Sequence, residues 1–202
     1  MNLKYIHPLI VLTYLLFYSP SAYTADTDNL KTKADYPWAV SLYGGVYSDD
    51  GLLDIAAFNA SWSDHNKVVV AALSREVYRY KQYLSFEIEG QVGRHFGDDL
   101  SHWEFVGLGM GRWHPFPWDD IVDTSFAFGA GGSYYTEISE VEKEDEDDAQ
   151  RGLIYLAFEL TFGLPDYPRW DLMLRMHHRS SAWGLVGAGS SNYGCIGLKY
   201  AF

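Results

Sequence analysis

The sequence predicts an all-β protein, an eight-stranded antiparallel transmembrane β-barrel of an outer membrane. Three observations predict this fold. Segments of period-two hydrophobic alternation follow one another along the chain, the connections between them alternate in length, and the chain ends in an alternating strand whose last residue is Phe202. The composition fits a folded domain, because the 202 residues are 48% hydrophobic and only 21% charged.

The first 25 residues are expected to form a secretory signal segment. Lys4 precedes the apolar run LIVLTYLLF, which is too short to span a bilayer as a helix of about 20 residues. Small residues follow the run, so cleavage is expected after Ala22 or Ala25. The predicted organisation is a signal peptide over 1–25 and one barrel domain over 26–202.

The alternation is clearest around Phe158. Apolar residues occupy every second position from 154 to 162, and Glu159 lies among the residues of the opposite face. The segment around Ile88 repeats the pattern, with Glu87 and Glu89 on its polar face. Only a strand separates such sets. An apolar outer wall and a polar lumen are typical of a membrane barrel.

About eight such segments are predicted, namely 38–47, 66–74, 80–93, 103–114, 121–136, 151–163, 169–181 and 192–202. An even number suits a closed antiparallel barrel. The connections expected to be short and rich in turn formers are 75–79, 114–120 and 164–168. The longer or more polar ones are 48–65, 94–102, 137–150 and 182–191. In outer-membrane barrels the tight turns face the periplasm and the long loops face outward.

The last strand is the most specific structural signal. Ile196, Leu198, Tyr200 and Phe202 follow one another at steps of two. This resembles the C-terminal strand of bacterial outer-membrane proteins that the barrel-assembly machinery reads, which makes that machinery an expected partner. A soluble β-sandwich could end in such a strand as well. Tryptophans near predicted strand ends favour the membrane barrel, since they form interfacial girdles; they are Trp38, Trp103, Trp113, Trp118 and Trp170.

The predicted lumen is narrow and filled with charged side chains. A barrel of eight strands is just wide enough for its own side chains, so a diffusion pore is not expected. Unpaired buried charges are costly, so a paired network is expected. By parity the inward-pointing residues include Glu87, Glu89, Glu159, Asp171, Arg175, His177 and Arg179.

Charge and cysteine content exclude several classes. The formal net charge is −12, which argues against nucleic acid as a partner. Cys195 is the single cysteine, so neither a disulfide scaffold nor a thiolate zinc cage can form within the chain.

Two loops carry possible metal ligands. His95 and His102 flank a loop with Asp98 and Asp99 that could bind a metal, although exposed, solvated histidines are the commoner arrangement. The acidic run at 137–148 could bind divalent cations that bridge lipopolysaccharide phosphates, or it could be a solvated extracellular loop. No cofactor is expected.

The outward row of segment 169–181 ends in two polar residues. Leu174 and Met176 belong to a lipid-facing row whose next members are His178 and Ser180. Residues two apart on a strand have Cα atoms roughly 6.5–7 Å apart, which can bring an imidazole within reach of a hydroxyl for nucleophilic catalysis. Alternatively, these polar residues simply mark the exit of the strand from the membrane.

A family resemblance bears on this choice. His177-His178-Arg179-Ser180-Ser181, then Gly184, Gly187, Gly189, Asn192 and the strand ending in Phe202, resemble the C-terminal part of the PagL-type lipid A 3-O-deacylases. Those enzymes are eight-stranded outer-membrane barrels that cut the ester-linked acyl chain at position 3 of lipid A. Their H-x-S motif, on the lipid-facing wall, implies His178 as base and Ser180 as nucleophile. The specific resemblance covers about the last 30 residues.

The sequence departs from this family at the third catalytic position. A carboxylate, normally Glu, is expected about a dozen residues after the serine, and Asn192 stands there. Asn can orient an imidazole but cannot stabilise imidazolium by charge. Ser181 stands where the family commonly has an Asn associated with oxyanion stabilisation.

The sequence thus predicts an acyl-ester hydrolase in the outer membrane of a Gram-negative bacterium, acting on lipid A or a related glycolipid. Ser180 is the predicted nucleophile, His178 the general base and then general acid, and Asn192 the residue that orients His178. The alternative is a non-catalytic outer-membrane barrel with a structural or surface-interaction role.

Overall fold

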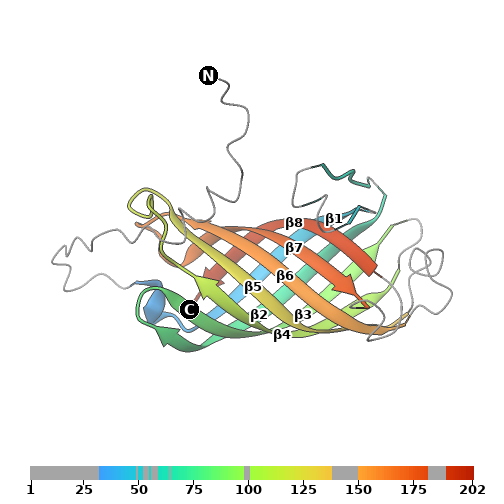
Figure 1. Ribbon diagram of the computed structural model, residues 1–202, viewed down its shortest axis with the longest axis horizontal. Helices are drawn as coiled ribbons and strands as arrows, with labels where there is room; N and C mark the ends of the chain where they lie inside the picture. The colour runs from blue at the N-terminus through green and yellow to red at the C-terminus, as the bar shows by residue number, and fades with distance from the viewer. Residues whose placement is uncertain are drawn as a thin grey trace, which may run out of the picture.

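A computed structural model describes residues 32–48, 50–51, 55, 59–63, 65–97, 101–137, 150–181 and 190–202. They form a closed eight-stranded barrel, which confirms the predicted fold class (Figure 1). A short 3-10 helix, η1 (Lys33–Asp35), precedes the strands. The strands are β1 (Trp38–Ser48), β2 (Lys67–Tyr80), β3 (Leu84–Phe96), β4 (Trp103–Trp113), β5 (Asp123–Tyr135), β6 (Gly152–Gly163), β7 (Trp170–Ser180) and β8 (Ser190–Ala201). The expected signal segment 1–25 lies outside the described residues.

Each strand is antiparallel to both neighbours, and β1 pairs with β8 to close the sheet. The chain end takes part in the closure, because the Phe202 N–H donates to the Trp38 carbonyl at 2.8 Å and the Trp38 N–H donates back at 3.2 Å. Closure leaves no strand edge with unpaired backbone groups facing lipid. No helix among the described residues has the length and apolar character needed to cross a membrane.

We call the two rims of the barrel the turn end and the loop end. The turn end carries the β2–β3, β4–β5 and β6–β7 connections, together with η1 and the C-terminus (Figure 1). The loop end carries the other four connections. The predicted alternation of connection lengths holds only in part, because the loop-end connection at 97–102 is shorter than the turn-end connection at 114–122.

The connection predicted at 75–79 is wrong. Those residues continue β2 in register with β3, and the turn lies at 81–83, where Lys81 has a φ of 52°. The register shifts between Glu76 and Tyr78, so the polar run contains a β-bulge. Glu76 and Arg79 form an ion pair there at 2.5 Å. The bulge and the ion pair let these charged residues continue the strand, although in the sequence they suggest a turn.

The two faces of the wall have opposite character, as the period-two alternation predicts. Outward side chains such as Leu42, Ile88 and Ile196 are 62%, 55% and 57% exposed, which suits a surface solvated by lipid. Inward side chains are buried and largely polar or charged. Trp38 and Trp170 lie outward at the turn end and Trp103 at the loop end, as an interfacial girdle requires.

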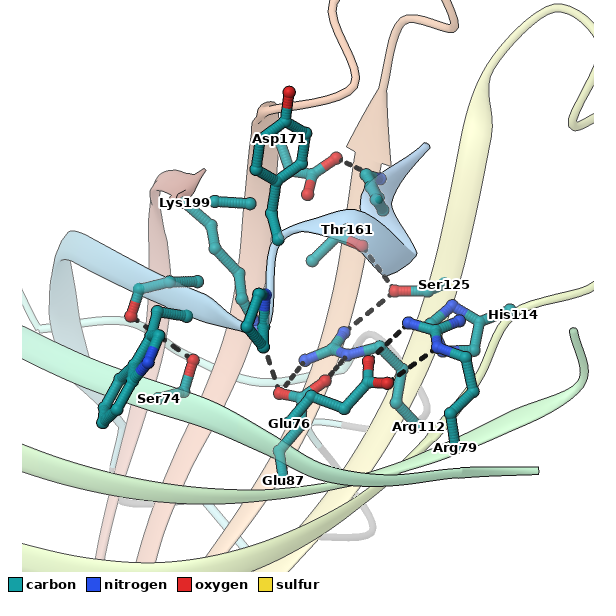
Figure 2. Close-up of a pocket in the computed structure, with 16 residues that line it drawn as sticks. Ser74, Glu76, Arg79, Glu87, Arg112, His114, Ser125, Thr161, Asp171 and Lys199 are labelled. Atoms are coloured by element: carbon teal, nitrogen blue, oxygen red, sulfur yellow. Dashed lines mark hydrogen bonds and ion pairs between the residues drawn. The ribbon is translucent and has the colours of Figure 1, made fainter. Parts of the chain in front are cut away.

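A balanced ionic network fills the middle of the lumen. It contains three carboxylates and three cations, namely Glu87, Glu89, Glu159, Arg112, Arg175 and Lys199. Arg112 joins Glu87 at 2.5 Å and Glu159 at 2.7 Å, and Figure 2 shows its guanidinium between polar groups of several strands. The formal charges of the six groups cancel. The prediction of a paired, filled lumen is therefore confirmed.

The turn end of the lumen is narrowed by η1. Lys33 Nζ lies 2.6 Å from Asp171 Oδ1 and 2.8 Å from Asp123 Oδ2, so the segment before β1 is bound to the beginnings of β5 and β7. A small polar pocket remains beside it and is lined by groups such as Glu76, Arg79 and His114 (Figure 2).

Candidate active site on the lipid-facing wall

Strand β7 carries the candidate base and nucleophile on its outward face. Leu172 and Leu174 are exposed, Met176 is half-buried, and His178 is only 9% exposed. The apolar wall thus becomes a covered polar patch as β7 approaches the loop end. Ser180 follows on the same face, is half-buried and ends the strand.

His178 is held by Asn192 of the neighbouring strand. The two residues face each other in the β7–β8 register, and His178 Nδ1 lies 2.5 Å from Asn192 Oδ1. The Asn192 Nδ2 group donates to the Asp50 carbonyl at 2.9 Å. With its amide nitrogen used as a donor, Asn192 presents its oxygen as an acceptor to His178. This arrangement selects the tautomer in which His178 Nδ1 carries the hydrogen and Nε2 has a free lone pair.

Asn192, the third predicted site residue, thus lies beside His178. Ser180 lies two residues after His178 on the same face of β7. Ser180 is opposite Ser190 in β8 and Ile154 in β6, which fixes its place at the rim. Ser181 follows directly after β7. Among the described residues no carboxylate forms an ion pair with His178.

An apolar hollow of about 800 Å³ lies on the outer wall next to this pair. This volume falls in the range of small-molecule sites. Met176 and Gly194, which line it, are paired in register one step before His178 and Asn192. The apolar side chains around it are Val46, Ile55, Trp62, Phe126, Phe158, Leu160, Leu174, Met176 and Ile196.

Trp62 forms one side of the hollow and comes from the β1–β2 connection. A β-carbon on Gly194 would lie 2.6 Å from the Trp62 ring, so the indole packs against the bare backbone of β8. This contact could not be predicted, because nothing in a loop tryptophan indicates which strand it will cover. The signal in the sequence was Gly194, because a glycine at an outward position of a strand often marks the close approach of another group.

A second polar cluster lies inside the lumen near the loop end, and here the prediction of exposed histidines is wrong. His95 and His102 are 0% and 2% exposed and stack with ring centroids 4.6 Å apart. His95 sits on an inward position of β3, so strand parity directs it into the lumen. Burial, together with the neighbouring His95, lowers the pKa of His102 to about 3.

His95 also belongs to a three-residue group that could hold a metal ion. His95, Glu104 and His177 are all buried, and their ligand atoms lie within 4.8 Å of one another. Strand parity predicts His177 in the lumen, but the proximity of the three residues depends on the register of β3, β4 and β7 and could not be predicted. Asp98, Asp99 and the acidic run from 138 onward lie outside the described residues.

Comparisons with known proteins give the fold. No protein-family model and no curated protein sequence matches the chain. The crystal structure of the outer membrane enzyme PagL is similar, with a TM-score of 0.54, 11% identity, and coverage of 81% of this chain and 99% of that chain. Neisserial surface protein A, NspA, gives a TM-score of 0.49 at 10% identity, covering 82% of this chain and 97% of its own.

OprG from Pseudomonas aeruginosa gives a TM-score of 0.44 at 12% identity, covering 88% of this chain and 99% of its own. At 11% identity the likeness to PagL shows the fold and assigns no activity. The chain has the architecture of bacterial outer-membrane barrels, which supports a location in that membrane.

Proposed function

We propose that the protein is an outer-membrane acyl-ester hydrolase that acts on lipid A or a related glycolipid. The observation that carries the proposal is the hydrogen bond from His178 to Asn192 on the lipid-facing wall, beside Ser180. A histidine fixed through Nδ1 keeps Nε2 available as a proton acceptor, as a general base requires.

In the proposed reaction, Ser180 Oγ attacks the ester carbonyl while His178 Nε2 takes the hydroxyl proton. His178 then gives this proton to the leaving alkoxide of the sugar, and an acyl group remains on Ser180. Water repeats the sequence, with His178 again as base, and releases the fatty acid. Asn192 keeps the imidazole oriented throughout and does not enter the proton transfer.

The surroundings support an acylated substrate. The apolar hollow beside the His178–Asn192 pair opens on the outer wall, where a lipid chain can enter without crossing water. Most of its lining residues are aromatic or aliphatic, although Glu159 and Arg175 also border it, so burial of an acyl chain there is favourable. The pair lies near the loop end, which in outer-membrane barrels faces outward. Lipid A of the outer leaflet fits both requirements.

The side chain at 192 limits the expected rate. An amide cannot stabilise imidazolium as a carboxylate does, and loss of that charge in a Ser-His-Asp enzyme can lower turnover ~10⁴-fold. The same observation favours the second candidate, a non-catalytic barrel whose lumen network provides stability. The two differ in whether Ser180 has a chemical role.

Mass spectrometry of lipid A tests the proposal. Bacteria producing the wild-type chain should contain lipid A that has lost one ester-linked acyl chain, whereas cells producing Ser180→Ala should not. Purified barrel in detergent should release the matching fatty acid. Unchanged lipid A with wild-type protein, both in cells and in detergent, would favour the scaffold.

A further inference from the structure

Glu104 is the exception among the buried lumen carboxylates. Glu87, Glu89 and Glu159 all pair with arginine or lysine. Within the described part of the chain, the ion-pair partners of Glu104 are histidines alone, although its side chain is 0% exposed. A neutral imidazole does not balance a buried negative charge, and an unbalanced charge in a low-dielectric lumen is costly.

The two histidines direct the same ring nitrogen at one carboxylate oxygen. Glu104 Oε2 lies 2.9 Å from His95 Nε2 and 2.8 Å from His177 Nε2. His177 Nε2 is buried and makes no hydrogen bond of acceptable geometry, even to that close oxygen. His177 Nε2 therefore faces a carboxylate and a second imidazole, and its hydrogen-bonding capacity is left unsatisfied.

The other nitrogen of each ring is held by a tyrosine. His95 Nδ1 lies 3.0 Å from the Tyr193 hydroxyl, and His177 Nδ1 lies 3.1 Å from the Tyr155 hydroxyl. Hydrogen bonds of this type orient histidines that bind a metal through the opposite nitrogen. Ser133 Oγ donates to Glu104 Oε1 at 2.5 Å and leaves Oε2 for the histidines.

We propose that His95, Glu104 and His177 form a divalent-metal site in the lumen, with zinc as the metal that two imidazoles and one carboxylate suit best. Such a donor set is typical of zinc, and sites with three protein ligands keep a further position for water. The cation supplies the positive charge that Glu104 otherwise lacks.

Small movements of the side chains accommodate the ion. Metal–ligand distances of about 2.0–2.2 Å place tetrahedral ligand atoms roughly 3.3–3.5 Å apart, so the nitrogens must move away from Glu104 Oε2 by about half an ångström. His95 is one residue from the end of β3 and Glu104 is the second residue of β4, so the site lies close to the loop end, from which an ion can enter.

Binding would join strands that are not neighbours. β3 and β4 are adjacent, but β7 is separated from β4 by β5 and β6. A metal held by all three therefore crosses the lumen and fixes β7 at His177, directly before His178. The site does not depend on the proposed hydrolase, because none of its ligands lies on the outer wall.

The test is metal binding by the folded full barrel in detergent micelles. After treatment with a chelator and its removal, titration with Zn²⁺ should show one tight site per chain by calorimetry. Co²⁺ in place of zinc should give the visible absorption bands of a tetrahedral or five-coordinate histidine site. His95→Gln, Glu104→Gln and His177→Gln should each weaken zinc binding more than the ~10–100-fold typical of an outer-shell change.

Matched variants keep the test decisive. His114→Gln removes a histidine at the turn end and should leave zinc affinity unchanged, as should Ser180→Ala, which would remove only the proposed hydrolase. If ligand variants fail to fold, Tyr155→Phe removes a single oxygen and should weaken binding about 10–100-fold. Absence of one-to-one zinc binding by the wild-type barrel overturns the proposal. Zinc binding by folded His177→Gln with the affinity of the wild type also overturns it.

Discussion

Asn192 Oδ1 lies 2.5 Å from His178 Nδ1, directly across the β7–β8 register on the lipid-facing wall. The second hydrogen bond of the same amide, to the Asp50 carbonyl at 2.9 Å, fixes which of its two atoms faces the imidazole. An amide in this position orients the histidine without supplying charge. The arrangement thus has the geometry of a base-orienting pair and lacks its electrostatics.

Removing the proposed nucleophile should abolish hydrolysis and leave the barrel intact. Ser180→Ala deletes one hydroxyl at the rim, so the folded protein should keep its heat-modifiable migration in electrophoresis. Fatty-acid release should fall to the residual level, a further loss of ~10²-fold, because the triad acts as a unit and Asn192 already lacks the contribution of a carboxylate. Ser181→Ala, one residue further, should have a milder effect. Equal rates for wild type and Ser180→Ala would remove the serine from the mechanism.

Restoring a carboxylate at 192 should raise the rate. In Asn192→Glu a negative charge faces His178 and stabilises the imidazolium formed when Ser180 is deprotonated, an effect that can reach ~10⁴-fold in related triads. The gain should be smaller here, because the carboxylate loses the hydrogen bond to the Asp50 carbonyl. Rates should be compared at pH ~8, where an ordinary imidazole is neutral.

Asn192→Gln is the matched control, since it lengthens the side chain equally without adding charge. A folded Asn192→Glu protein that is no faster than Asn192→Gln would show that residue 192 is not the third member of the triad.

Strand parity explains what the sequence could predict. Alternation alone assigned Glu159 to the lumen and His178 to the outer wall, because a period of two is a local property of a strand. The pairing of His178 with Asn192 was implied by the family resemblance, whose spacing after the serine falls on Asn192 of the neighbouring strand.

Contacts set by distant segments could not be predicted. The approach of His95 to His177 depends on curvature across the whole barrel, and the packing of Trp62 on Gly194 depends on the path of a loop. The end of β2 was misplaced because a β-bulge lets charged residues continue a strand. Such bulges have little signature in a single sequence.

Filling the hollow beside the candidate site should impair long-chain substrates selectively. Gly194→Val adds a side chain where even a β-carbon would lie 2.6 Å from the Trp62 ring, so the indole must move and the hollow shrinks. KM for a long-chain ester should rise several-fold, while a short-chain ester should be affected little. Gly132→Val is the control, because nothing lies within 4 Å of its added β-carbon. Equal effects on both esters would argue against an acyl-binding hollow.

Breaking the lumen network should destabilise the barrel strongly. Glu159→Gln leaves three cations, Arg112, Arg175 and Lys199, facing two carboxylates in place of three. An uncompensated buried charge lowers the free energy of unfolding by about 3–5 kcal/mol. Glu76→Gln makes the same chemical change in the more exposed pair with Arg79. It should lower the free energy of unfolding by no more than about 1 kcal/mol. Urea unfolding in micelles, followed by tryptophan fluorescence, measures both. Similar midpoints for the two variants would contradict a stabilising role for the network.

Acid should destabilise the wild-type barrel partly through His114, at the turn end. Burial, together with the charges of Arg79 and Arg112, lowers the pKa of His114 to about 3 (Figure 2). The unfolded chain takes up this proton below pH ~6.5, whereas the folded barrel does so only near pH 3. Between these values the unfolded state binds more protons, so stability falls as pH falls.

His114→Gln can keep a hydrogen bond to Ser85 Oγ, now 2.8 Å from His114 Nε2, without titrating. Relative to wild type, the variant should therefore gain stability between pH ~7.5 and ~4.5 in urea unfolding. An unchanged difference between the two proteins across that range would show that His114 is not a source of the acid sensitivity.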